Sequence, residues 1–369
     1  MKIVKATQSY EQWLAKRIAL IDTDLARKHE AMAEDPFSFL RATFYRWMQL
    51  WPDVCHDCAT APQLLAVGDL HVENFGTWRD VEGRLVWGIN DFDEAYELPY
   101  TVDLIRLAAS AHFAIRGARL AIGLKDACDA ILAGYKEGLT AGGAPFVLEE
   151  HHHWLRAMVS GVLRDPPHFW AKLDAWPSQK TLPASARKAI EKLLPAKGLR
   201  YRLVHRVAGL GSLGRERYVA IAECSGAKIA REAKALAPSA CVWASDAKSS
   251  APRYQEILDR AVRSKDPFVR MKGPWIVRRL APDCSRVELA SMPKARDETR
   301  LLYSMGFETA NVHCGTRKAA KWILKDLGKR PHLWLHRASQ RMAEAVTQDW
   351  ERWRAHWHTE RKPGISSGA

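Results

Sequence analysis

Two short polar segments, residues 68–76 (GDLHVENFG) and residues 90–95 (NDFDEA), carry the strongest indications of the fold and the functional site. Each follows an apolar run, residues 63–67 (QLLAV) and residues 85–89 (LVWGI), with the length and composition of a short strand. The polar residues therefore stand where predicted strands end. Because this arrangement exposes side chains at the strand ends, we expect the chemistry of the protein there.

The residue types in these segments suit metal-assisted phosphoryl transfer. Asp69 and Asn74 lie five residues apart in one predicted loop, and Asp91 and Asp93 follow the second strand. Carboxylate and amide oxygens are ligands that Mg²⁺ accepts, with water and phosphate completing the shell. Phosphoryl transfer needs that metal and a carboxylate that orients and deprotonates the acceptor hydroxyl. In the simpler alternative, Asp69 and Asn74 only form turns, while Asp93 and Glu94 are solvated or cap the next segment.

The pattern G-D-L-H-x-x-N followed by N-D-F-D resembles the catalytic and metal-binding loops of kinase-like small-molecule phosphotransferases, the aminoglycoside and choline kinase group. The resemblance implies that Asp69 is the catalytic base and that Asn74 and Asp91 bind the metal. It places His71 in the catalytic loop as a supporting residue, and Asp93 is close enough to Asp91 in sequence to share its metal. ATP and Mg²⁺ are the implied cofactors.

A closer resemblance, over nearly the whole chain, is to the uncharacterised bacterial domain-of-unknown-function family 2252. Its marks are P-F-x-F-x-R, G-D-x-H-x-x-N-F-G, N-D-F-D-E-A, D-L-x-R-L-A and G-x-G-S-x-G. They occur at residues 36–41, 68–76, 90–95, 103–108 and 209–214. Asp103 matches a kinase position that braces the catalytic loop, so we expect a structural role for it, as for Arg41.

The last of these marks, residues 209–214 (GLGSLG), lies between two predicted strands, residues 201–207 and 217–222. Such a hairpin can lay backbone N–H groups over phosphates, which makes Gly209, Gly211, Ser212 and Gly214 candidate nucleotide-binding residues. In ordinary kinases the glycine-rich loop precedes the catalytic loop, whereas here it follows. The order predicts either circularly permuted lobes or another role for the glycine segment, such as a plain β-turn.

The cation that holds the phosphates is expected on the strand after this hairpin, which offers Lys228, Arg231 and Lys234. The kinase pattern K-E-A aligns best with residues 231–233, which favours Arg231, with Lys228 as a neighbouring candidate. Arginine holds phosphate well through its fork of donors, but it is an unusual replacement at this position. Glu256, on the following predicted helix, is a candidate partner carboxylate.

The pattern of apolar residues predicts a mainly helical α+β protein with a kinase-like, two-lobed core. We expect a helical segment (1–62), a catalytic and metal-binding lobe (63–199), a glycine-loop β lobe (200–282) and a C-terminal helical region (283–369) with a short disordered tail. Residues 14–25 are expected to form one helix face and residues 146–163 a helix. Residues 166–183, rich in Pro and Trp, are expected to form a connection.

The composition indicates a folded, basic protein. Lys and Arg exceed Asp and Glu by 14, which favours anionic partners such as nucleotides, phosphorylated metabolites, nucleic acid or acidic lipid. Half of the excess lies between residues 315 and 363, where a solvated helix face is the simpler explanation. The seven scattered cysteines, including Cys55 and Cys58, do not indicate a disulfide framework. No membrane span and no secretion signal are expected, so the expected location is the cytoplasm.

The leading functional prediction is an ATP- and Mg²⁺-dependent phosphotransferase for a small hydroxyl- or amine-bearing molecule, with nucleotidyl transfer as a variant. A two-metal phosphoesterase shares the G-D-x-H opening but requires a G-N-H-[DE] block that the sequence does not contain. A third hypothesis is a non-catalytic pseudokinase or an anion- or nucleic-acid-binding regulatory module. The sequence does not determine the acceptor or the oligomeric state.

Overall fold

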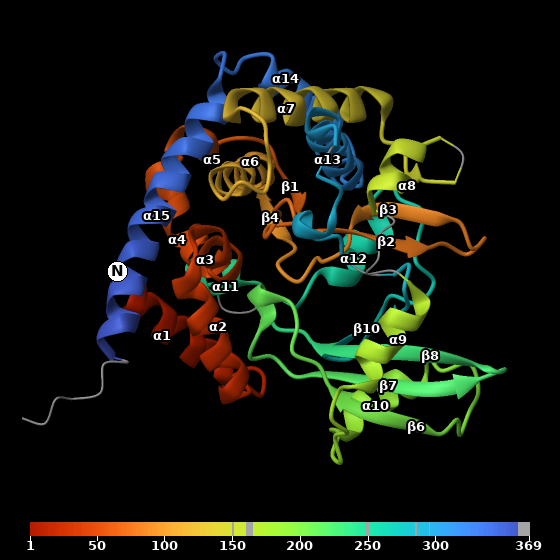
Figure 1. Ribbon diagram of the computed structural model, residues 1–369. Helices are drawn as coiled ribbons and strands as arrows, with labels where there is room; N and C mark the ends of the chain where they lie inside the picture. Colours follow the sequence, from red (N-terminus) through yellow and green to blue (C-terminus); the bar gives the residue numbers. More distant parts are fainter. Residues whose placement is uncertain (150, 160–164, 248–250, 285, 295, 361–369) are drawn as a thin grey trace, which may run out of the picture.

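The computed structural model describes residues 1–149, 151–159, 165–247, 251–284, 286–294 and 296–360 (Figure 1). Helices make up about half of the chain, and the described strands form three antiparallel sheets. The predicted mixture of helices and strands is therefore confirmed, with about half of the chain helical and the strands paired antiparallel. The predicted disordered tail, residues 364–369, lies outside the described residues.

Five helices precede the first strand: α1 (Ile3–Ala15), α2 (Asp22–Glu34), α3 (Pro36–Ala42), α4 (Phe44–Val54) and α5 (His56–Ala59). Pro36 opens α3 as predicted, and Asp35 caps this helix by accepting hydrogen bonds from the backbone N–H groups of residues 37 and 38. The prediction of one helix through residues 14–25 is wrong. The chain breaks between α1 and α2 because Leu20 forms a β-bridge with Arg215, and the N–H of Ile21 donates to the carbonyl of Gly214 at 2.8 Å.

Two small sheets carry the predicted catalytic segments. Strands β1 (Gln63–Ala66) and β4 (Tyr96–Pro99) form one, and β2 (Phe75–Arg79), β3 (Leu85–Ile89) and β5 (Phe146–Val147) form the other. Residues 146–163 do not form one helix, because β5 pairs with β3 and only α8 (His153–Val159) is helical among the described residues there.

Three helices pack behind these sheets: α6 (Thr101–Arg116), α7 (Leu124–Ala141) and α13 (Glu298–His313). The contact between α7 and α13 depends on two glycines. A Cβ on Gly134 would lie 1.9 Å from the carbonyl oxygen of Tyr303, and a Cβ on Gly306 would lie 2.0 Å from that of Ile131. Any larger residue at either glycine would separate the two helices.

The third sheet has five strands in the order β6-β7-β8-β10-β9, drawn below the small sheets in Figure 1. These strands are β6 (Tyr201–His205), β7 (Arg217–Cys224), β8 (Ala227–Ala235), β9 (Arg270–Lys272) and β10 (Trp275–Leu280). Helix α10 (Ala184–Glu191) contributes to the apolar cluster on one face, and α9 (Pro166–Asp174) contributes Leu173 to the cluster on the other. The predicted connection at residues 166–183 thus contains α9, which Asp165 caps by accepting a hydrogen bond from the N–H of His168.

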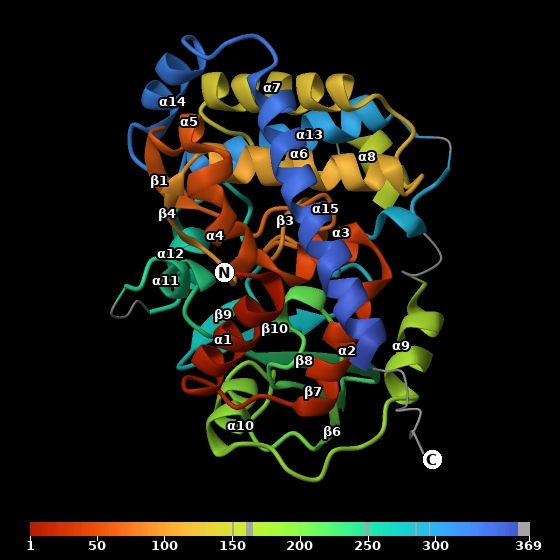
Figure 2. The same ribbon diagram turned by 90° about the vertical axis from the view of Figure 1, so that its left-hand side faces the viewer.

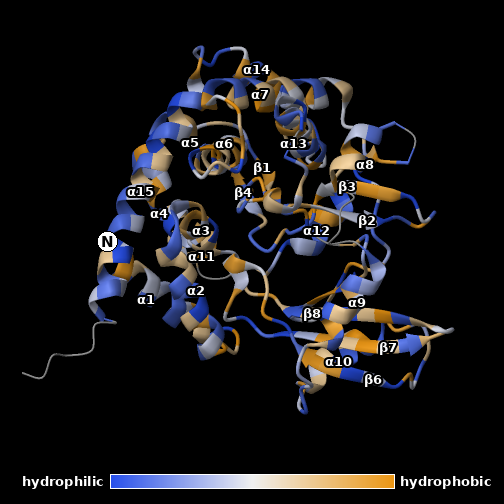
Figure 3. Ribbon diagram, in the orientation of Figure 1, coloured by the Kyte–Doolittle hydropathy of each residue, from blue (hydrophilic) through white to orange (hydrophobic). Residues whose placement is uncertain are grey.

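The remaining helices are α11 (Ala240–Ala244), α12 (Tyr254–Arg260), α14 (Ala319–Leu327) and α15 (Trp334–Glu360). Helix α15 runs along α6, α4 and α2 (Figure 2), and its largely hydrophilic colouring in Figure 3 shows its solvated face. Trp353 is buried in the core, whereas Trp350 and Trp357 pack at its edge. All seven cysteines are free, and no helix among the described residues is long and apolar enough to cross a membrane.

Candidate active site

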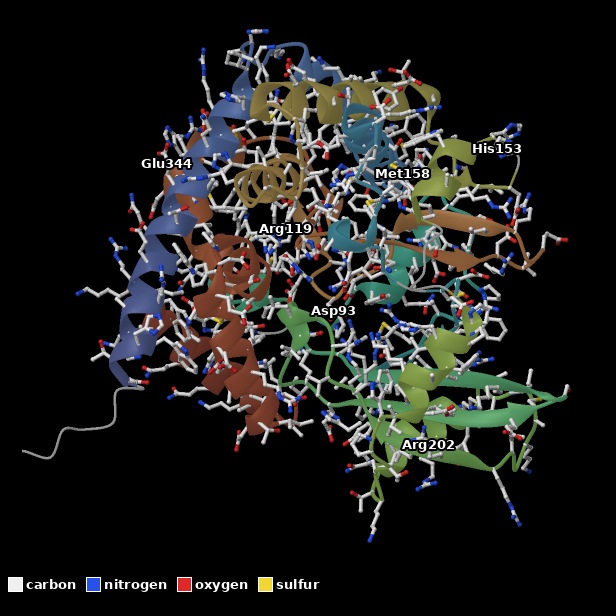
Figure 4. All side chains as sticks on the ribbon, in the orientation of Figure 1. Asp93, Arg119, His153, Met158, Arg202 and Glu344 are labelled. Atoms are coloured by element: carbon white, nitrogen blue, oxygen red, sulfur yellow. The ribbon has the colours of Figure 1, made fainter. Side chains whose placement is uncertain are left out.

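A cavity of about 750 Å³ separates the predicted catalytic segments from the five-stranded sheet. Figure 4 labels Asp93 at this level, between the helix-rich part of the molecule and the sheet. The structure brings to the cavity wall nearly all of the predicted catalytic, metal-binding and glycine-loop residues: Asp69, His71, Asn74, Asp91, Asp93, Gly209, Gly211 and Ser212. Segments that are far apart in the sequence therefore share one site.

The loop that carries Asp69 is fixed by Asp103 on α6. The two carboxylate oxygens of Asp103 accept hydrogen bonds from the N–H of Val67 at 2.7 Å and of Gly68 at 2.8 Å. The ring of His313 lies 2.9 Å from the same carboxylate. Gly68 has φ +82°, and a Cβ there would lie 2.5 Å from a backbone carbonyl oxygen, so only glycine fits this turn. Asp103 thus takes the bracing position expected from the sequence.

Asp69 is paired with Arg106, a residue for which the sequence analysis gave no role. Arg106 donates to Asp69 Oδ1 from Nε at 2.8 Å and also from Nη2. Its side chain is fully buried, with the rings of Phe44 and Trp47 5.0 and 4.9 Å from the guanidinium carbon. Burial raises the pKa of Asp69, and the charge of Arg106 opposes this effect. Because both bonds use Oδ1, Oδ2 is left for a ligand.

Asn74 connects the two predicted catalytic segments. Its Nδ2 donates to the backbone carbonyl of Asp69 at 3.2 Å and to that of Asp91 at 3.1 Å. Its Oδ1 has no hydrogen-bond partner among the described residues, which leaves this oxygen for a cation. His71 supports the same loop, since its Nδ1 accepts the N–H of Glu73 at 3.2 Å. Burial and nearby arginines hold the pKa of His71 well below its ordinary value, so the ring is neutral.

The cation nearest to the two aspartates is Lys234 on β8. Its Nζ lies 3.0 and 3.1 Å from the carboxylate oxygens of Asp91 and 2.6 Å from Asp93 Oδ2. Burial favours the neutral form of Asp91, but the charge of Lys234 outweighs it and holds the pKa of Asp91 below its ordinary value. Burial and the charge of Asp91 raise the pKa of Asp93. Glu256 does not contact Lys234, because it pairs with Arg253 at 2.6 Å.

The structure does not place Lys228 or Arg231 in the cavity. Lys228 pairs with Asp174 at the surface, and Arg231 donates from Nε to the carbonyl of Leu193 at 2.9 Å. Arg231 also lies over the ring of Phe268, 4.5 Å from its centre. Successive residues of a strand face opposite sides of the sheet, so Arg231 is turned away where Lys234 is turned inward. The alternation of side chains along the strand could have separated Lys234 from Arg231 in the sequence. It could not identify the inward residue without knowledge of which face of the sheet meets the predicted catalytic segments.

The sheet adds a cluster of arginines to the cavity around Glu232, the neighbour of Lys234 on the same strand face. Arg206 and Arg217 are ion-paired with Glu232, the latter at 3.1 Å, and Arg278 lies 3.7 Å away. Burial opposes ionisation of Glu232, but these three charges hold its pKa below the ordinary value. The carboxylate of Glu232 offsets only one of the three guanidinium charges, so this cluster has an excess of positive charge.

The glycine loop, residues 209–214, packs against the loop that carries Asp69. A Cβ on Gly211 would lie 3.3 Å from Asp69 Oδ2, and the carbonyl of Gly211 accepts a hydrogen bond from Lys28 at 3.3 Å. Ser212 Oγ accepts a hydrogen bond from Arg217 at 2.8 Å. Gly214 does not line the cavity. It has φ +93° and lies against Leu25 of α2, so its role is in shaping the turn.

The residues present could supply part of the ligand shell of a Mg²⁺ ion. Among the described residues, no three His, Cys, Asp or Glu side chains gather into a metal site. Asp91, Asp93 and the amide oxygen of Asn74 would supply protein ligands, and Asp93 Oδ1 is buried without a hydrogen-bond partner. Mg²⁺ commonly uses one or two carboxylates together with substrate phosphates and water. The donor set thus suits a metal that arrives with a nucleotide.

Glu94 has a structural position. Its carboxylate accepts hydrogen bonds from the N–H of Ala240 at 2.6 Å and from Ser239 Oγ at 2.9 Å, and it pairs with Arg215 at 3.2 Å. It therefore holds the start of α11 against the second catalytic segment, in keeping with a capping role.

Fold and site together define a mixed α+β protein, about half helical, with a strongly charged cavity between the two predicted catalytic segments and an antiparallel sheet. Over residues 20–158 the chain matches the family described as an uncharacterized protein conserved in bacteria, domain-of-unknown-function family 2252. This is the family predicted from the sequence, and the matched stretch includes both predicted catalytic segments and Asp103, whereas the glycine loop at residues 209–214 lies outside it. Neither a curated protein nor a solved structure matches the chain.

Proposed function

We propose that this protein is an ATP- and Mg²⁺-dependent phosphotransferase that acts on a small hydroxyl- or amine-bearing molecule. The observation that carries the proposal is the meeting, in one cavity, of Asp69, Asn74 and the Asp91–Asp93 pair with the glycine loop and Lys234. A base, a set of hard metal ligands and a phosphate-binding loop are the parts that phosphoryl transfer requires.

The five-stranded sheet supports the proposal. In protein kinases a glycine-rich loop covers the phosphates, and the phosphate-binding lysine is on the third strand of the sheet. Here the glycine loop joins the first and second strands, β6 and β7, and Lys234 is on the third, β8. The same parts in a different chain order favour circularly permuted lobes.

The proposed roles follow from the contacts. Asp69 orients the acceptor hydroxyl through Oδ2, because Arg106 occupies Oδ1. Lys234 and the arginines around Glu232 hold the phosphates, while backbone N–H groups of the glycine loop cover them. Bound Mg²⁺ would neutralise charge on the transferred group, held by Asn74, Asp91 and Asp93. The same arrangement also suits transfer of the nucleotidyl group.

The alternative is a non-catalytic module that binds nucleotide or nucleic acid. The apparent lack of the usual lysine and the inverted order of the motifs support this alternative. Lys234 weakens the first of these grounds, since its Nζ lies beside Asp91 and Asp93, where a phosphate-binding lysine is expected. A module for nucleic acid would bind with an affinity that falls steeply as salt rises.

Calorimetry of ATP binding with and without Mg²⁺ tests the proposal on the wild type and on Asp91→Ala. Asp174→Ala is the matched control, because Asp174 pairs with a lysine at the surface of the same sheet. We expect binding near micromolar affinity that weakens about a hundredfold without Mg²⁺ or in Asp91→Ala, the size of effect for lost charge pairing in a buried site. Absence of ATP binding in a folded wild type would remove the ATP hypothesis.

A further inference from the structure

One stretch of the cavity wall, near Asp69, combines α3, α9 and the segment 286–291, which includes a short 3-10 helix (Leu289–Ser291). This segment is attached to the end of the catalytic loop. Arg286 forms a β-bridge with Gly76, and the N–H of Val287 donates to the carbonyl of Phe75 at 2.9 Å. The segment is therefore fixed next to the loop that carries Asp69, and its side chains can reach a molecule bound there.

Three cations line this wall: Arg41 from α3, Lys172 from α9, and Arg286. Two carboxylates accompany them, and each is already paired. Arg41 Nη1 lies 2.7 Å from Glu73 Oε2, and Arg286 Nη2 lies 2.6 Å from Glu288 Oε1. Lys172 has no ion-pair partner among the described residues. The wall therefore has one positive charge more than its carboxylates offset.

The arginines also have donors to spare. Arg41 is nine-tenths buried, and its Nη2 has no hydrogen-bond partner in the described part of the chain. Among the described residues Arg286 donates a hydrogen bond only from Nη2, so its Nη1 and Nε remain for a ligand. The charges of Arg286, Glu73 and Glu288 all act on Arg41, which places these groups in one electrostatic neighbourhood. Guanidinium groups with open donors bind carboxylate or phosphate in a two-pronged geometry.

The same arrangement disfavours a cationic acceptor. The carboxylates beside this wall are already engaged, since arginines pair with Glu73 and Glu288 and Arg106 pairs with Asp69. At this wall an amine-bearing substrate would lie beside an uncompensated positive charge, whereas an anionic substrate would offset that charge.

Resting on the proposed phosphotransferase function, we propose that the acceptor is a small hydroxyl compound that also carries a carboxylate or phosphate group. Arg41, Lys172 and Arg286 bind the anionic group, and the hydroxyl lies at Asp69. This narrows the substrate class to hydroxy acids and phosphorylated alcohols, and it separates the protein from kinases that act on cationic amines.

The test is calorimetry on protein saturated with Mg²⁺ and a non-hydrolysable ATP analogue, so that the nucleotide site is occupied. The probes are inorganic phosphate, glycerol 3-phosphate, glycerate and, as a cationic hydroxyl compound, choline. The variants are Arg286→Gln and Lys172→Gln, whose side chains lie at the cavity surface, with Lys188→Gln on the outer helix α10 as the matched control. A comparison of inorganic phosphate with glycerate shows whether the wall binds a phosphate group or a carboxylate.

We expect the anionic probes to bind the wild type and Lys188→Gln, and each cavity variant to bind them about tenfold more weakly, the loss for one charge-assisted hydrogen bond. Choline is expected not to bind. Nucleotide binding without any anion binding would overturn this inference and leave the proposed function standing. Equal anion affinity in wild type and both cavity variants, or binding of choline in preference to the anions, would also overturn it. If the analogue itself does not bind, the proposed function fails, and the inference about its acceptor fails with it.

Discussion

Replacing Lys234 by methionine tests whether this buried lysine is the cation that Asp91 and Asp93 require. The Lys234 side chain is 1% exposed, and its Nζ is within 3.1 Å of Asp91 and within 2.6 Å of Asp93. Methionine has a similar length but no charge, so the variant leaves two neighbouring carboxylates without their nearest counter-charge. Removing one partner of a buried ion pair typically lowers the free energy of unfolding by about 3–5 kcal/mol.

Two features of the site limit this loss. The Asp91 side chain is about one-third exposed, so water screens part of the repulsion. Asp93 can also bind a proton, and protonating a carboxyl of ordinary pKa at pH 7 costs at most about 4 kcal/mol. We therefore expect Lys234→Met to lower the free energy of unfolding by about 3 kcal/mol at pH 7.

The loss must depend on pH. Without Lys234 the pKa of Asp93, which burial and Asp91 already raise, rises further in the folded protein. A carboxyl whose pKa is raised in the folded state contributes stability below its unfolded pKa, and this stability is lost as pH rises through the folded pKa. The deficit of the variant is therefore smaller at pH 5 than at pH 7, by about 1 kcal/mol or more.

The assay is urea denaturation of the wild type, Lys234→Met and the control Lys228→Met at both pH values. Lys228 lies on the same strand but pairs with Asp174 at the surface, so its replacement is expected to change stability by less than about 1 kcal/mol. If the aspartates also bind Mg²⁺, about 10 mM MgCl₂ will stabilise Lys234→Met more than the wild type. An equal loss in both variants, or a loss that is the same at pH 5 and pH 7, would show that Lys234 is not the counter-charge of the two aspartates.

Three further substitutions test the frame around the site. Asp103→Asn replaces one carboxylate oxygen that accepts a backbone N–H, and we expect a loss of about 3 kcal/mol in urea denaturation, against little change for exposed Asp53→Asn. Gly214→Ala places a Cβ 2.4 Å from a side-chain carbon at φ +93°, whereas Gly226→Ala has only the strain of φ +80°, so the first is expected to destabilise by about 1 kcal/mol more. Burial raises the pKa of Glu308 to about 7 from 4.5, so the wild type should lose about 3 kcal/mol relative to Glu308→Gln as pH rises through this window. Parallel stability curves for those two proteins, or equal losses for the two glycine variants, would contradict the respective prediction.

The sequence determined the local features of this protein. The apolar runs at residues 63–67 and 85–89 contain strands β1 and β3, because each run is short and ends in a polar turn. Pro36 opens a helix because its fixed φ suits a first turn. The positions of Asp69, Asn74 and Asp91 followed from motif and spacing, and all three line one cavity. Such signals are carried by neighbours in the chain, so they survive without knowledge of the fold.

Tertiary structure decided which distant residues complete the site. Lys234 and Arg231 are three residues apart on one strand, yet only Lys234 reaches Asp91, because side chains alternate between the two faces of a strand. Arg106 and Asp69 meet only because α6 packs behind the loop that carries Asp69. The break between α1 and α2 likewise depends on a β-bridge between Leu20 and Arg215. These pairings are set by sheet register and helix packing, which bring together residues whose separation along the chain gives no sign of contact.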